Sequence, residues 1–443
     1  MGLLDELIEV LSDLVSYDTT INPDEGKLPD FRILDYLASR TALRSMRLEV
    51  LESGGIRNLV ATSGGGRPVV MFMAHVDTVP FARDEWTHDP LRLEVEGDLA
   101  YGRGALDDKG NVAAVVAAAG MLGEPRSGTL VVALTGDEEV GGANGARVVR
   151  DYLASRGLMP DYLVNADGNS MVIINRRRAA LVVRLRARAE PVAVRGRALS
   201  LSARLSTPAA PNRHAAYFVP GVDSHPLLTI SYVAWNRGYL ARSLRGSFVK
   251  SNVLPSWAEA ELVEPCGGCP EVEADAGLTA LVRALAPVSR MSLRTVSPSA
   301  YGVTVTPNVY RRLGDVHEVV LDVRAMTTDA GEVRRAVLDS LRASGIDGEV
   351  DVEVEVHGGY LSTDEGSRIV SLAKEALASL GVRPLVREMA GASDAGYFSP
   401  LGVQVIDFGP AGGNIHGPDE YVSLSSLELT ARFYYEVMRR LLT

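Results

Sequence analysis

Val131-Val-Ala-Leu-Thr-Gly-Asp-Glu-Glu-Val-Gly-Gly142 joins an apolar run to a cluster of negative charge. The apolar, β-branched part predicts a buried strand, and Asp137, Glu138 and Glu139 follow it directly. Three adjacent carboxylates repel one another and are costly to bury without a partner. Two interpretations are open: the acids form a solvated turn, or a cation binds where the strand ends. An isolated acidic triplet favours the turn, so the other strand ends decide between the two.

Composition restricts the classes of protein to consider. The chain has 443 residues, enough for two or three domains, and its 46% apolar and 23% charged content is typical of a globular protein. A net charge of −11 argues against a nucleic-acid-binding surface, which is normally basic. No apolar run approaches membrane-spanning length, and the N-terminus carries Asp5, Glu6 and Glu9 where a signal peptide would be basic. We therefore expect a cytoplasmic protein without nucleic-acid or membrane partners.

Two further predicted strands also end in side chains that can bind metal. Val69–Ala74 is a continuous apolar run, as expected for a strand buried on both faces, and it leads into His75 and Asp77. Side chains at i and i+2 point the same way in an extended chain, so Asp77 can accept a hydrogen bond from the second ring nitrogen of His75. The predicted strand 162–166 ends at Asp167. In open α/β sheets, sites are built at this edge.

The glycine-rich segment Tyr101-Gly-Arg-Gly-Ala-Leu-Asp-Asp-Lys-Gly110 adds Asp107 before a predicted helix. It lacks the spacing of a phosphate-binding loop, and its two aspartates would repel a phosphate, so it favours a cation. The candidate ligands have the composition of a two-metal site: His75, Asp107, Glu139, Asp167 and His416. Imidazoles and carboxylates suit Zn²⁺, Co²⁺ or Mn²⁺. One bridging carboxylate would hold the two ions ~3.5–4 Å apart.

The pattern of the chain predicts an α/β fold in three segments. Residues 1–177 and 358–443 alternate strands with long helices, which predicts one mixed-sheet catalytic domain with helices on both faces. Residues 178–357 predict an inserted α+β domain with two helices, Ala274–Leu285 and Ala330–Ser344. The arginines that begin at Arg176 alternate with apolar residues and predict a solvated strand face.

The two cysteines, Cys266 and Cys269, lie among glycine and proline. Two thiolates cannot complete a tetrahedral zinc site. The setting favours a structural turn, which an intraloop disulfide could close, with a redox role as the alternative.

Five motifs in this order resemble the zinc-dependent M20 amidohydrolases: HVDTVP (75–80), GRGALDDKG (102–110), GDEEVGG (136–142), GASDAGYF (391–398) and NIHGPDEYV (414–422). That family includes acetylornithine deacetylase, succinyl-diaminopimelate desuccinylase, aminoacylases and carboxypeptidase G-type enzymes. The resemblance spans nearly the whole chain. It implies a catalytic domain interrupted by a lid and dimerisation domain, and so a homodimer.

The resemblance also implies a metal ligand role for each of the five candidates. His75 and Asp167 would hold one ion. Glu139 and His416 would hold the other, and Asp107 would bridge both.

Further roles follow from the same resemblance. Asp77 would orient His75, while Glu138 would be the general base that activates water and then protonates the leaving amine. Asp108 is expected to lie behind the ligands or to face solvent. The glycines at 141 and 142 are expected to give the backbone room to turn away from the ions.

The inserted domain is implied to contact the substrate. His214, in Arg213-His-Ala-Ala-Tyr-Phe, would reach across the dimer to the oxyanion, although the family has glycine where this chain has Arg213. Arg324 and Asn308 would hold a substrate carboxylate, with Tyr217 as a neighbour. A surface ion pair is the alternative for Arg324.

The expected activity is hydrolysis of a small N-acyl amino acid, N-acetyl or N-succinyl, that carries a free carboxylate. A dipeptidase or carboxypeptidase of the same family is the alternative. A non-catalytic metal-binding scaffold is a third reading, which Glu138 disfavours because a scaffold has no need of a carboxylate that does not bind metal.

Overall fold

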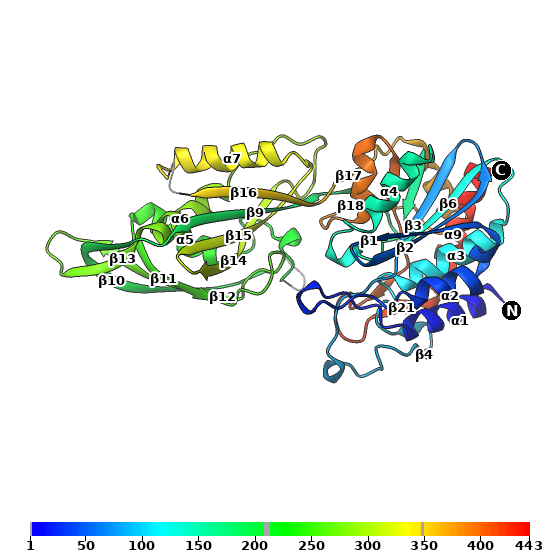
Figure 1. The fold of residues 1–443 in the computed structure, drawn as a ribbon, viewed down its shortest axis with the longest axis horizontal. Coiled ribbons are helices and arrows are strands. Elements are labelled where there is room, and N and C mark those ends of the chain that lie inside the picture. Colours follow the sequence, from blue (N-terminus) through cyan, green and yellow to red (C-terminus); the bar gives the residue numbers. More distant parts are fainter. Residues whose placement is uncertain (1, 208–212, 347–349) are drawn as a thin grey trace. The chain divides into compact units, whose positions relative to one another are not determined.

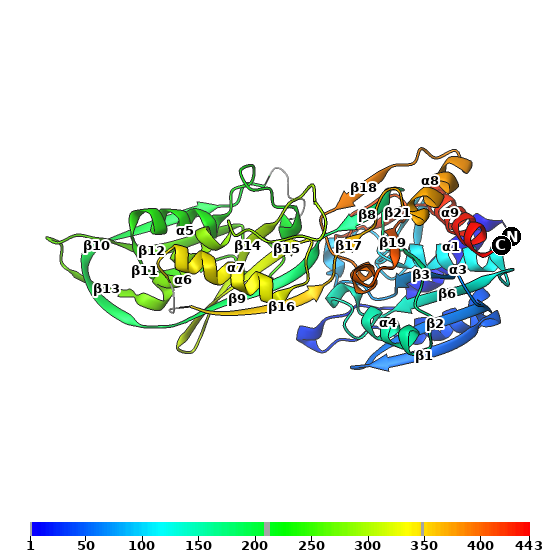
Figure 2. The same cartoon turned by 90° about the horizontal axis from the view of Figure 1, so that it is seen from above.

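The structure is a computed structural model that describes residues 2–207, 213–346 and 350–443. The chain forms two compact units (Figures 1 and 2). The first comprises Met1–Arg177, Leu361–Met389 and Ser393–Thr443, and the second Arg178–Tyr360 and Ala390–Ala392. In the described part of the chain, every helix is too short or too polar to cross a membrane.

A nine-stranded mixed sheet is the framework of the first unit. Its described strands follow in the order β1 (Arg47–Ser53), β2 (Ile56–Gly65), β6 (Gly128–Thr135), β3 (Val69–His75), β7 (Tyr162–Asn165), β19 (Gln404–Asp407), β8 (Ile173–Arg177) and β17 (Leu361–Ser362), with β18 (Val386–Met389) beside β8. A smaller sheet has the order β20 (Gly412–Gly413), β21 (Tyr421–Ser423), β5 (Leu99–Tyr101) and β4 (Glu94–Glu96). In the large sheet, β6, β3, β7 and β19 are parallel neighbours, so their carboxyl ends meet at one edge.

Helices cover both faces of the large sheet, as the sequence predicts. On one face lie α1 (Leu3–Ser16), α2 (Arg32–Arg40), α3 (Lys109–Leu122), α8 (Arg368–Ser379) and α9 (Leu424–Leu442). On the other lies α4 (Ala146–Ser155). Alternate residues of β3 enter the two cores: Val70 and Phe72 pack with α1, α3 and α9, while Met71 and Met73 pack with α4. Burial on both faces explains the unbroken apolar run of this strand.

The described residues of the second unit form a barrel, a sheet and three α-helices. The barrel is closed by β10 (Pro191–Arg204), β12 (Trp257–Pro265), β11 (Leu240–Gly246) and β13 (Glu271–Asp275). The sheet has the order β14 (Thr304–Leu313), β15 (Val316–Ala325), β9 (Ala179–Arg188) and β16 (Asp351–Gly358). The helices are α5 (Pro226–Arg237), α6 (Ala276–Val288) and α7 (Ala330–Ala343). One hydrophobic core contains residues of these helices, of the barrel and of the sheet. A Cys266–Cys269 disulfide closes the turn between β12 and β13, which agrees with a structural turn.

Two expectations for this region are wrong. The unit has a third described helix, α5, whose β-branched and aromatic residues obscure the helical pattern, although Pro226 at its start and the left-handed Gly238 at its end are ordinary helix boundaries. The arginines are not all solvated: Arg177 is 7% exposed and Arg178 is fully buried. Arg178 donates to the Thr304 hydroxyl at 2.9 Å and to backbone carbonyls, so its charge is compensated inside the unit.

Candidate active site

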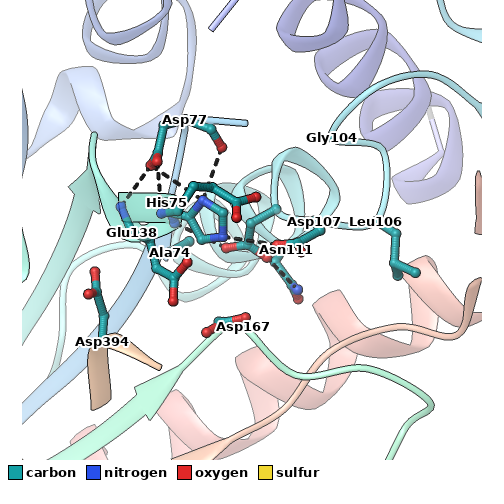
Figure 3. Close-up of polar contacts among 12 residues, drawn as sticks. Ala74, His75, Asp77, Gly104, Leu106, Asp107, Asn111, Glu138, Asp167 and Asp394 are labelled. Carbon is teal, nitrogen blue, oxygen red and sulfur yellow. Dashed lines mark hydrogen bonds and ion pairs between the residues drawn. The ribbon is translucent and has the colours of Figure 1, made fainter. Parts of the chain in front are cut away.

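The three acids that follow β6 have three different surroundings. The Asp137 carboxylate accepts the backbone N–H of Asn144 at 2.8 Å, just before α4, and so serves the local fold. The Asp77 carboxylate accepts the backbone N–H of Glu138 at 3.1 Å and that of Glu139 at 3.0 Å (Figure 3). Asp77 is fully buried, and its two bonds fix the backbone from which the Glu138 and Glu139 side chains project.

The glycines after these acids make room for another carboxylate. Gly141 and Gly142 have φ values of 101° and 66°, in the left-handed region that glycine tolerates. A Cβ on Gly142 would lie 2.1 Å from Asp394 Oδ1. The expected reason for these glycines, a turn away from metal ions, is therefore incomplete, because Gly142 also admits Asp394.

His75 lies at the end of β3, where its two ring nitrogens face different partners. Nε2 is 3.0 Å from Asp107 Oδ1. Nδ1 is 3.1 Å from the backbone oxygen of Asp77 and 3.4 Å from its carboxylate, so the carbonyl is the closer orienting contact. Burial lowers the pKa of His75, but the hydrogen bonds with Asp107 and Asp77 outweigh it and raise that pKa well above its ordinary value.

Asp107 lies between two histidines. Its Oδ1 faces His75, and its Oδ2 is 3.1 Å from His416 Nε2. His416 Nε2 is also 3.2 Å from Glu139 Oε2. We call the group Asp107, Glu139 and His416 the His416 side of the site. A carboxylate whose two oxygens each face a different imidazole has the arrangement of a bridging ligand.

Asp167 extends from the end of β7 into the same region, beside Glu138 and Asp394 (Figure 3). We call His75, Asp107 and Asp167 the His75 side. Burial, together with the neighbouring charge of Asp107 and against the opposing effect of Arg177, raises the pKa of Asp167 to about 7. Burial and the charge of Asp167 likewise raise the pKa of Glu138 well above its usual range.

These residues fit divalent cations. Ligand atoms of Asp107, Glu139 and His416 all lie within 4.8 Å of one another, as do those of His75, Asp107 and Asp108. Glu139 Oε1 is buried and has no hydrogen-bond partner in the described part of the protein. Several carboxylates whose pKa values are raised by burial and by mutual repulsion, together with two imidazoles and an unpartnered oxygen, form a donor set that a cation would neutralise.

Of the two positions expected for Asp108, the structure has the one behind the candidate ligands: it is 1% exposed and accepts the backbone N–H of His75 at 3.0 Å. Two other residues near the candidate ligands were missed from sequence. Asp394 accepts the hydroxyl of Thr135 at 3.3 Å. Glu420 accepts the backbone N–H of Asp107 at 2.9 Å. The motifs around Asp394 and Glu420 were visible in the sequence, but nothing there indicated what these two side chains contact.

The four candidates for substrate contact all lie in the second unit. Tyr217 meets the His214 ring edge-on at 5.9 Å, and His214 Nδ1 accepts the backbone N–H of Ala216 at 3.1 Å. Arg324 forms a two-pronged ion pair with Asp322, both contacts at 2.8 Å, and is 6% exposed. The alternative of an ion pair therefore holds for Arg324, but in a buried setting.

Asn308 is fully buried, and each end of its amide has a partner. Its oxygen faces His225 Nε2 at 3.1 Å, and its NH₂ donates to the Thr306 hydroxyl at 3.0 Å and to the Ser251 carbonyl. Because the amide oxygen is the acceptor in this arrangement, His225 Nε2 carries the proton.

Comparisons with known proteins agree with this fold. A succinyl-diaminopimelate desuccinylase of Xanthomonas euvesicatoria pv. vesicatoria is 28% identical over 99% of this chain and 100% of its own. An aminoacylhistidine dipeptidase of Vibrio alginolyticus has a similar fold, with a TM-score of 0.72, 16% identity and coverage of 98% of this chain and 96% of that one. The YXEP protein of Bacillus subtilis, a dinuclear metal-binding peptidase, has a TM-score of 0.53, 13% identity and coverage of 99% and 98%.

The fold, the clustered ligands and the full-length relative define a metallopeptidase-type hydrolase that acts on amide bonds. The sequence profile of peptidase family M20/M25/M40 matches residues 71–440. The chain belongs to this family.

Proposed function

We propose that this protein hydrolyses the amide bond of an N-acyl amino acid, an N-succinyl or N-acetyl compound with a free carboxylate, at a two-metal site. The observation that carries the proposal is Asp107, whose two oxygens face His75 and His416, together with Glu138, which lies near His75 and Asp167 (Figure 3). The name of the Xanthomonas relative supports the N-succinyl class, since the similarity to that relative extends over 99% of this chain.

His75 and Asp167 are proposed to hold one cation, Glu139 and His416 the other, and Asp107 both. The cations are proposed to be Zn²⁺, with Co²⁺ or Mn²⁺ as alternatives, because all three accept this mixture of ligands. When bound, they would polarise the substrate carbonyl and lower the pKa of a water molecule.

Glu138 is the proposed general base. It takes a proton from the attacking water and returns it to the leaving amine, and a carboxyl group with a raised pKa suits both transfers. Asp77 supports these steps by holding the backbone of Glu138 and Glu139.

The second unit is proposed to supply specificity as a lid and dimerisation domain, giving a homodimer in which His214 stabilises the oxyanion. Arg324 keeps N–H groups beyond the two that bind Asp322, and these are proposed to bind the substrate carboxylate. Asn308 can bind a substrate only by giving up one of its present hydrogen bonds. Tyr217 is proposed to lie beside the substrate that Arg324 and Asn308 bind. The cytoplasm is the proposed location.

The test is a substrate panel assayed with added Zn²⁺ or Co²⁺ and with EDTA as control. We expect N-succinyl or N-acetyl amino acids to be cleaved at least tenfold faster, by kcat/KM, than dipeptides, and EDTA to abolish cleavage. Faster cleavage of dipeptides would favour the dipeptidase alternative. No cleavage of any amide by the metal-loaded protein would favour the scaffold reading.

A further inference from the structure

A buried ion pair, Arg103–Glu420, lies behind the site without a place in the proposed reaction. Arg103 Nη1 donates to Glu420 Oε2 at 2.6 Å, and the two side chains are 2% and 1% exposed. The Trp86 ring lies 5.1 Å from the Arg103 guanidinium. Such a pair is weak support for stability, because the cost of desolvating two charges offsets their attraction. The other contacts of the pair indicate a more specific role.

Glu420 holds the backbone of the loop that carries Asp107. Its Oε1 accepts the backbone N–H of Leu106 and that of Asp107, both at 2.9 Å. Its Oε2 accepts the backbone N–H of Gly104 at 3.1 Å. Three backbone donors and one guanidinium therefore converge on a single carboxylate, and one of them is the amide of the proposed bridging ligand.

The same ion pair also fixes the segment that carries His416. Glu420 lies four residues after His416, and Arg103 Nη2 donates to the Gly417 carbonyl at 3.1 Å. His416 has φ 62° and Asp419 has φ 51°, conformations that non-glycine residues rarely adopt without support. Arg103 and Glu420 thus connect the two segments whose side chains meet on the His416 side.

Asp167, on the His75 side, is supported by a different buried pair. Arg177 Nη2 donates to the Asp167 carbonyl at 2.7 Å, and Arg177 Nε lies 2.5 Å from Asp407 Oδ2. Asp407 is fully buried and also accepts the Ser393 hydroxyl at 2.9 Å. Arg177 and Asp407 therefore support the ligand candidate that belongs only to the His75 side, while Arg103 supports the segment of His416, which belongs only to the other side.

We propose that Arg103 and Glu420 are positioning residues that set the affinity of the His416 side for its cation. They do so by holding the backbone segments of Asp107 and His416 so that the two side chains can bind the same cation. The inference rests on the proposed two-metal function. Neither residue touches a reacting atom in this scheme. Asp107 is a proposed ligand of both cations, but His416 is a proposed ligand of only one, so removal of Arg103 or Glu420 should weaken the cation on the His416 side much more than the other.

The test measures cation binding, apart from activity. Glu420→Gln and wild type are titrated with Co²⁺, followed by visible absorption and by calorimetry, and dialysed samples are analysed for metal content. We expect the variant to bind one cation about 10- to 100-fold more weakly, the usual effect of losing a group that orients a ligand, and the other within about threefold. His416→Ala identifies the weakened cation, because it should lose the same one.

Three further variants separate positioning from general stability. Glu318→Gln removes a fully buried carboxylate of the second unit that pairs with Arg186 and Arg311, each at 2.7 Å, and should leave both cations bound. Asp407→Asn should weaken the cation on the His75 side instead. Arg103→Lys keeps the charge but cannot reach both Glu420 and Gly417, so it should reproduce the selective loss even if Glu420→Gln folds poorly.

Equal weakening of both cations in Glu420→Gln and Arg103→Lys, or no weakening of either, would overturn the inference. So would an equal effect of Glu318→Gln. A wild type that binds fewer than two cations contradicts the proposed function itself and this inference with it. If the wild type binds two cations and Glu420→Gln binds both with unchanged affinity, only this inference is overturned.

Discussion

Asp77→Asn tests how the site is held without removing any proposed metal ligand. In the wild type, one Asp77 oxygen accepts the backbone N–H of Glu138 and the other that of Glu139, at 3.1 and 3.0 Å. Asparagine keeps one acceptor and turns an NH₂ group toward the second N–H. The variant therefore loses one charge-assisted hydrogen bond in a fully buried position and gains an unfavourable donor–donor contact.

The expected loss can be calculated from that single bond. A hydrogen bond to a charged group contributes about 1.5–3 kcal/mol. If this free energy is what holds Glu138 and Glu139 in position, its loss corresponds to a decrease of about 10- to 100-fold in cation affinity or kcat/KM. Cation affinity is measured by competition with a chromophoric chelator, and kcat/KM with the best substrate of the panel.

Asp161→Asn is the matched control. Asp161 accepts the backbone N–H of Val69 at 2.7 Å, at the opposite end of β3 from His75, and pairs with Arg67. It should lower stability without changing cation affinity. If Asp77→Asn retains wild-type cation affinity and kcat/KM, or if Asp161→Asn loses as much of both, the proposed role of Asp77 is wrong.

Three further predictions concern pH, metal removal and specificity. Burial lowers the pKa of His225 from 6.5 to about 4, so the folded state binds fewer protons than the unfolded state between these values. The contribution of neutral His225 to the free energy of unfolding is fully present above pH 6.5 and falls by about 3 kcal/mol as the pH drops to 4. In urea unfolding, the free energy of unfolding of the wild type should therefore fall by this amount relative to that of His225→Gln over the same pH range. An equal pH dependence of the two proteins would refute this. EDTA should lower the free energy of unfolding by about 3 kcal/mol for each cation removed, about 5 kcal/mol for two, relative to protein at cation concentrations 100 times each Kd, measured by denaturant titration. An unchanged midpoint would show that the acids are stable without a cation. Arg324→Lys should raise KM for carboxylate-bearing substrates at least tenfold with little change in kcat, and an equal effect on substrates whose carboxylate is amidated would contradict a role in binding that group.

Much of the first unit follows from local sequence patterns. The apolar run before His75 predicts burial on both faces, and the alternation of Phe72 and Met73 between two cores confirms it. Parallel strands bring their carboxyl ends together, which explains why His75 and Glu139 lie in one place although they come from different strands. The family resemblance supplied the individual roles, which the strand pattern alone does not distinguish.

Other features depend on contacts that no local pattern reveals. Arg103 and Glu420 are separated by 317 positions, so their ion pair is visible only once the chain is folded. Arg178 lies at the start of a basic, alternating stretch that predicts exposure, yet it is buried because backbone carbonyls and the Thr304 hydroxyl compensate its charge. In both cases a charged residue is buried by partners distant in sequence, which a strand or helix pattern cannot indicate.

The central claim is that Glu138 works beside the cations without binding them. One preparation of Glu138→Gln, loaded with Zn²⁺ or Co²⁺, tests it by metal analysis and by hydrolysis of the best substrate. We expect two cations per chain, as in the wild type, and a rate lower by about 10²- to 10⁴-fold, the usual contribution of a general base. Full hydrolysis with two cations bound, or loss of a cation together with the activity, would contradict the claim.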